Sequence, residues 1–135
     1  MPNAYDAGIK LVYVADPDPA PARFTIDDVS LGAEFKVVAD VEVGSAMHAL
    51  VTKYDMVVGV VNLTRCQSVT VVKDGASISP DNSGVALRKI IEVTIPSGWA
   101  NALEGDVLQV VASFKLTAGA VFDYSAAISP TFVVS

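Results

Sequence analysis

Two stretches of the chain alternate between apolar and polar side chains with a period of two. In residues 34–43 the apolar side chains fall on one face, and they are Phe35, Val37, Ala39, Val41 and Val43. In residues 107–117 the corresponding side chains are Leu108, Val110, Ala112, Phe114 and Leu116. Polar residues fill most of the opposite faces. Because successive side chains of a β-strand point to opposite faces, this period predicts two strands that each bury one face.

Six further segments have the apolar character of strands, and turn-forming residues separate them at intervals of roughly ten residues. These segments are residues 9–15, 24–29, 54–64, 67–74, 85–95 and 128–134. Residues 44–53 fit either a short helical turn that begins near Ser45 or a loop. The pattern predicts an all-β protein of seven to eight mostly antiparallel strands, folded as a sandwich or a small barrel.

Composition agrees with this prediction and limits the chain to one domain. The 135 residues include 23 Val and 18 Ala but only 8 Leu, and valine fits a pleated sheet better than a helix. We interpret residues 1–21 as an N-terminal strand with a proline-rich crossover, and residues 22–135 as the sandwich. The C-terminal segment 128–134 should pair with 107–117. The N-terminal strand should cover the opposite edge or pair with a neighbouring copy.

Two motifs resemble the immunoglobulin-like β-sandwich superfamily. Leu31-Gly32-x-x-Phe35-x-Val37-x-Ala39-x-Val41 is similar to the entry into its second strand, and Leu103-x-Gly105-Asp106-x-Leu108-x-Val110 to the corner before its sixth strand. Antibody-type members carry cysteines where Ala39 and Val110 stand, a tyrosine at Leu108, and a core tryptophan near Met56 or Val58. The resemblance therefore implies a disulfide-free module of the bacterial or phage type, with Ala39 and Val110 buried close together. Such modules mostly bind, space or assemble.

The sequence offers little for catalysis. His48 and Cys66 are the only histidine and cysteine, and nothing near Cys66 indicates an activated thiol, so we expect a loop histidine and a buried or half-buried thiol. The acidic pairs Asp27-Asp28 and Asp40/Glu42 fit a solvated surface. Glycine motifs for phosphate or dinucleotide binding do not occur. We expect no enzyme activity, no catalytic residue, no metal and no cofactor.

Charge and hydropathy restrict the partners. Nine Lys and Arg face 15 Asp and Glu, a formal net charge of −6, so we expect no nucleic-acid partner. The longest apolar run, residues 56–61, is far shorter than the ~20 residues of a membrane helix, so we expect no membrane insertion. The start of the chain has no export signal, which favours an intracellular or virion location, with a mature secreted chain as the other option.

The surplus of apolar residues leads to the functional hypothesis. Val38, Val72, Ile90 and Val111 are expected to face outward on otherwise polar faces, and they form the candidate interface of a homo-oligomer. The sequence thus favours a non-enzymatic structural or assembly protein, such as a virion decoration or shell component or a subunit of a bacterial fibre or layer.

The alternative is a module that recognises a carbohydrate or a protein through loops at one end. Its candidate contacts are His48, Asp81, Asn82 and Trp99. Trp99 fits either a ring on which a sugar stacks or an apolar plug between two strands, and we favour the plug.

Overall fold

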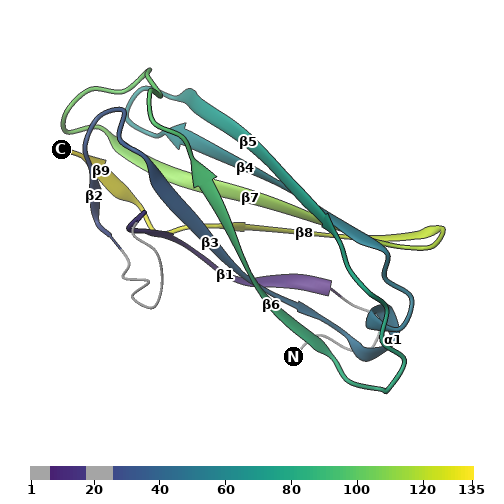
Figure 1. The fold of residues 1–135 in the computed structure, drawn as a ribbon. Helices are drawn as coiled ribbons and strands as arrows, with labels where there is room; N and C mark the ends of the chain where they lie inside the picture. The colour runs from purple at the N-terminus through teal and green to yellow at the C-terminus, as the bar shows by residue number, and fades with distance from the viewer. Residues whose placement is uncertain (1–6, 18–25) are drawn as a thin grey trace.

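A computed structural model describes residues 7–17 and 26–135. Nearly all regular structure in this part of the chain is β-strand (Figure 1). In chain order the elements are β1 (Ala7–Ala15), β2 (Asp28–Val29), β3 (Phe35–Val43), α1 (Ser45–His48), β4 (Lys53–Asn62), β5 (Gln67–Ser77), β6 (Leu87–Ile95), β7 (Val107–Ala118), β8 (Val121–Ile128) and β9 (Phe132–Val134). The predicted all-β class is confirmed, and residues 44–53 hold a short helix whose N-cap is Gly44.

The strands form two sheets that pack as a sandwich. One sheet has the order β1-β3-β6 and is antiparallel throughout. The other has the order β2-β9-β7-β4-β5, with β8 also paired to β7. β8 and β9 lie along the same edge of β7, one after the other, while β2 runs parallel to β9. The prediction that the C-terminal segment pairs with the strand at 107–117 is therefore confirmed.

The core lies between the sheets and consists of the residues that the period of two selects. Phe35 packs edge-on against Trp99 and Phe132, with ring centroids 6.1 Å and 5.6 Å apart. Ala39 on β3 and Val110 on β7 are both buried members of this core, as expected. Phe132 and Val134 are buried from the last strand, whereas Val133 between them is exposed.

The described residues form nine strands rather than seven or eight because the C-terminal region pairs twice. We expected one strand at 128–134, but the structure has β8 before it and a break at 129–131. Ser129 fills the break: its hydroxyl accepts a hydrogen bond from the Val110 N–H (3.0 Å), and its own N–H donates to the Val110 carbonyl (2.9 Å). The predicted strand at 24–29 is seen only as β2, and most of the proline-rich crossover lies outside the described residues.

The break changes which side chains of β8 face the core. Val111 pairs with Ile128 and Leu108 pairs with Phe132, so three steps along β7 match four steps along β8–β9. One extra residue reverses the alternation of side chains. As a result, Phe132 faces the core while Phe122 and Tyr124 of β8 are exposed.

The inward positions of β8 close one side of the sandwich. The Asp123 carboxylate accepts a hydrogen bond from the Ala7 N–H (2.7 Å), and the Ser125 hydroxyl accepts one from the Ile9 N–H (3.0 Å). β1 thus covers an edge of its own domain: it pairs with β3 on one side and meets β8 on the other.

Two neighbouring residues of β7 test this register. Val110 is fully buried and Val111 is 40% exposed. Val110→Asp should abolish folding, because an unpaired carboxylate in the apolar core costs more than about 4 kcal/mol. Val111→Asp should keep the far-ultraviolet circular dichroism spectrum of the native protein and a cooperative thermal transition, because its carboxylate reaches solvent. If both variants melt like the wild type, the faces of β7 are assigned wrongly.

Deleting residues 1–21 tests the role of β1. The deletion removes the buried Val12 and Val14 and uncovers an edge of β3, so Tm should fall by roughly 10 °C or more. Differential scanning calorimetry and light scattering would measure stability and association together. An unchanged Tm with lost association would place this segment between copies, and no change in either would make it a passive tail.

Candidate functional site

The structure turns two of the four predicted interface residues away from solvent. Val38 does lie on the outer face of β3, but it is only 1% exposed and does not belong to the core cluster. Tyr13 of β1 and Glu92 of β6 are its direct neighbours in register, so long side chains cover it from both sides. Our expectation that Val38 is exposed is wrong. The alternation within one strand does not include the side chains of the two flanking strands.

Val72 faces the core for a different reason. The pairing of β4 with β5 shifts between Val60 and Val61, so Val72 lies opposite the buried Val58 and packs against the core. Without that irregularity, Val72 would lie opposite Val57 and point outward, as we expected. Ile90 and Val111 are exposed as predicted, although on different sheets.

The outer face of the larger sheet gathers more exposed apolar surface than we expected. Ile128, Val111, Gly59 and Val71 lie side by side across β8, β7, β4 and β5, and we call them the apolar row. Phe122 and Tyr124 continue the exposed surface along β8. Large apolar and small polar side chains already alternate in the sequence of residues 121–128, which is typical of a strand. In the structure the small polar side chains of this strand face inward, so the large apolar ones are exposed.

Three lysines border this apolar surface. Lys115 lies opposite Tyr124 in register, Lys53 lies on β4 and Lys73 on β5. The Lys115 ammonium is 4.2 Å from the Phe122 ring centroid and 5.8 Å from that of Tyr124, which is cation–π geometry. Lys53, Lys73, Lys115, Phe122 and Tyr124 are called the lysine–aromatic face below. Asp55, opposite Lys115 on β4, is the carboxylate among them.

The predicted loop contacts serve mainly as internal anchors. His48 is buried in α1, and its Nδ1 lies 2.9 Å from the Val85 carbonyl oxygen. The Asp81 N–H donates to the His48 carbonyl (2.9 Å), so the loop is fastened over α1. The Asp81 carboxylate accepts a hydrogen bond from the Ser83 N–H (2.9 Å), and hydrogen bonding to Ser83 lowers the pKa of that carboxyl. Asn82 remains exposed.

Trp99 is the plug that we favoured. It is buried, its Nε1–H donates to the Ala33 carbonyl at 2.7 Å, and its ring packs against Phe35. Its ring is therefore not an exposed platform for a sugar.

Cys66 and His48 reverse our expectation. The thiol is exposed, in a turn where Cys66 has a positive φ of 54°, and the histidine is the buried group. Cys66 follows the end of β4 and His48 precedes its start, so the ten residues of β4, about 33 Å of strand, separate them. The described residues contain no group of three His, Cys, Asp or Glu side chains that could hold a metal ion.

The acidic pair Asp40/Glu42 is neutralised by neighbouring cations. Arg88 bonds Asp40 through Nε (3.2 Å) and Nη2 (2.6 Å), and Lys10 lies 3.0 Å from Glu42. The hydrogen bonds from Arg88 are the main reason that the pKa of Asp40 is lowered. Asp40 is buried and the Glu42 side chain is only 14% exposed, so our expectation of a solvated surface is wrong for this pair.

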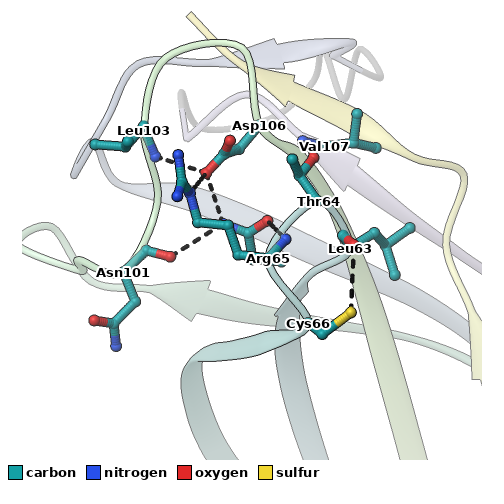
Figure 2. A network of polar contacts seen from close by, with 9 residues as sticks. Leu63, Thr64, Arg65, Cys66, Asn101, Leu103, Asp106 and Val107 are labelled. Atoms are coloured by element: carbon teal, nitrogen blue, oxygen red, sulfur yellow. Dashed lines mark hydrogen bonds and ion pairs between the residues drawn. The ribbon is translucent and has the colours of Figure 1, made fainter.

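The most densely bonded polar cluster joins the β4–β5 turn to the corner before β7 (Figure 2). Oδ2 of the buried Asp106 accepts hydrogen bonds from Asn62 Nδ2 (2.9 Å), Arg65 Nε (2.8 Å) and the Leu103 N–H (2.9 Å). Asn62 also donates to the Asn101 carbonyl at 3.1 Å, and its own oxygen accepts from the Arg65 N–H at 3.2 Å. This arrangement holds the shape of one end of the sandwich.

The same contacts keep Asp106 ionised. The hydrogen bond from Asn62, followed by those from Leu103 and Arg65, lowers the pKa of Asp106 below its ordinary value. Its oxygen is already engaged by three donors, which suits a structural anchor rather than a proton-transfer group.

Comparison with models of known protein families and with curated proteins gives no match to this chain. In the described part of the chain, no helix has the length and apolar character needed to span a membrane.

Asp106→Asn should destabilise the protein, because an amide cannot accept all three hydrogen bonds and brings its own donors toward Asn62 and Arg65. We expect Tm at pH 7 to fall by roughly 5–10 °C. Because the folded pKa of Asp106 is lowered, its contribution is present above the unfolded pKa of about 4 and is lost as the pH falls through the folded pKa. Thermal scans from pH 7 to 2 should therefore show a flatter acid decline for the variant.

Glu104→Gln is the matched control, since it removes an exposed carboxylate from the same corner. It should leave Tm nearly unchanged. Equal losses in both variants would mean that the charge of the corner matters and the hydrogen bonds do not.

Proposed function

We propose that this chain is a non-enzymatic structural protein that associates with copies of itself, as a virion decoration or shell component or as a subunit of a bacterial fibre or layer. The observation that carries the proposal is the outer face of the larger sheet, where the apolar row and two aromatic side chains are exposed together. Contiguous exposed apolar surface of this kind usually marks a contact site.

The area of this exposed apolar surface limits the interface that it could form by itself. It lies within four strands about 4.8 Å apart and the six steps from Phe122 to Ile128, about 3.4 Å each, so it covers less than roughly 300 Å². A stable interface buries about 800 Å² on each partner. The association we propose must therefore extend beyond the apolar row, onto the lysines and loops around it.

Two features support a finer assignment of the sandwich to the immunoglobulin-like type. β1, β3 and β6 form one sheet, and β2, β4, β5, β7, β8 and β9 form the other. Apart from the two-residue β2, this is the distribution expected for strands A, B and E against C, C′, F and G. Ala39 on β3 and Val110 on β7 are buried at the positions where related domains place bridging cysteines.

The ligand-binding alternative loses most of its candidate contacts. His48 and Trp99 are buried, and only Asp81 and Asn82 remain exposed. A hollow of roughly 120 Å³, lined by residues that include Tyr13, Asp27 and Thr131, is smaller than the ~300 Å³ of ordinary small-molecule sites. We therefore favour self-association.

Size-exclusion chromatography with light scattering, at concentrations up to the high micromolar range, tests the proposal. Wild-type protein should exceed its monomer mass of 14.1 kDa. Tyr124→Thr/Ile128→Thr should associate at least tenfold more weakly, because these side chains are 68% and 61% exposed and supply the apolar contact. A wild-type protein that stays monomeric would overturn the proposal.

The other sheet offers a matched control. Leu11 and Ile90, 51% and 50% exposed, occupy β1 and β6 of the smaller sheet. Leu11→Thr/Ile90→Thr should associate like the wild type. If this pair dissociates and the first does not, the contact lies on the smaller sheet and the surface assigned above is wrong.

A further inference from the structure

Charged residues of opposite sign lie at opposite ends of the sandwich. The register places Lys53 opposite Thr117, near the β7–β8 hairpin, and Lys115 opposite Tyr124. At the other end, Asp28 lies opposite Val133, and the residue after Glu104 donates its N–H to the Val134 carbonyl (2.7 Å). Figure 1 shows the β7–β8 hairpin at one extreme of the molecule and β2 and β9 near the other.

Among the described residues, these charged groups form no ion pairs. Lys10, Lys36, Arg65 and Arg88 all form ion pairs with described carboxylates. No such ion pair is found among the described residues for the three lysines of the lysine–aromatic face. The same holds for Asp27, Asp28 and Glu104 at the opposite end, which we call the acidic corner together with Leu31 and Leu103.

Both ends also expose large apolar side chains. Phe122 and Tyr124 accompany the lysines, while Leu31 and Leu103 accompany the carboxylates, and all four are at least half exposed. Apolar contacts surrounded by complementary charges form a common type of protein interface. The two ends therefore match in both apolar surface and charge.

Charge also decides between the two ways in which copies could meet. A twofold contact between two lysine–aromatic faces would bring six lysines and only two Asp55 carboxylates together, within the ~10 Å over which surface charges act at 0.1 M salt. Contact between a lysine–aromatic face and an acidic corner would bring together charges of opposite sign.

We infer that copies of this chain join head to tail, with the lysine–aromatic face of one copy against the acidic corner of the next. This inference rests on the proposed self-association and specifies its surfaces. Each copy keeps one surface of each kind free, so the contact repeats without closing unless the rotation between copies completes a ring.

A charge-exchange experiment tests the inference. Lys53→Glu/Lys73→Glu makes the lysine–aromatic face acidic, and Asp28→Lys/Glu104→Lys makes the acidic corner basic. Each variant alone should associate at least tenfold more weakly than the wild type, because like charges then meet at every contact. An equimolar mixture should recover assembly, because each altered surface is complementary to a surface of the other variant. Sedimentation velocity and negative-stain electron microscopy would measure both effects.

The controls distinguish a failure of the head-to-tail contact from a failure of the proposed self-association. Lys89→Glu, an exposed lysine on β6 outside both surfaces, should assemble like the wild type. A monomeric wild type would overturn self-association itself. A wild type that assembles, with both reversed variants assembling equally well, would overturn only the head-to-tail contact. Monomeric variants that do not recover on mixing would also overturn it.

Circular dichroism and Tm must show that the reversed variants are folded. If Lys53→Glu/Lys73→Glu unfolds, Lys53→Gln/Lys73→Gln replaces it and should associate several-fold more weakly than the wild type. Unchanged association of that neutral variant would overturn the inference.

Discussion

The larger sheet depends on the pairing of β7 along both of its edges. β4 bonds one edge over ten residue pairs, and β8 and β9 share the other edge. Five side chains of β7, from Leu108 to Leu116, face the core and are completely or almost completely buried. A strand held in this way has one stable register, because a slip by one residue would move all five side chains to the solvent face.

The start of β7 is fixed by polar contacts as firmly as its middle is fixed by apolar ones. Asp106 precedes the first residue of the strand and bonds the Leu103 N–H, Asn62 and Arg65. Its own backbone carbonyl accepts a hydrogen bond from the Val134 N–H at 2.9 Å. Through its carboxylate and its backbone carbonyl, Asp106 therefore connects β4, the corner before β7 and the end of β9. The same contacts position the loop that carries Leu103 and Glu104 at the acidic corner.

The sequence predicted the sandwich because burial imposes a period of two on β3 and β7, and that period is visible without coordinates. It did not predict which face each remaining strand presents. Val72 faces the core only because the register shifts by one residue between β4 and β5, and such a shift leaves no mark in the hydrophobic pattern. The prediction that Val38 is exposed was wrong for another reason. Its neighbours in register are Tyr13 and Glu92, which come from other strands. The burial of Trp99 was predictable because a large aromatic ring at a corner between two strands gains most by packing into the core.

The extra residue between β8 and β9 has a genetic consequence. If the register of β9 continued unbroken along β7, Phe122 and Tyr124 would turn into the sandwich. Asp123 and Ser125 would turn outward. The backbone amides of Ala7 and Ile9 would then lose these hydrogen-bond acceptors. Removing a single codon from the segment 129–131 would thus force that exchange or break the pairing of one of the two strands. The surface chemistry of this face is therefore set by the length of a three-residue connection as much as by the residues that form it, and a change in that length alters every position of β8 at once.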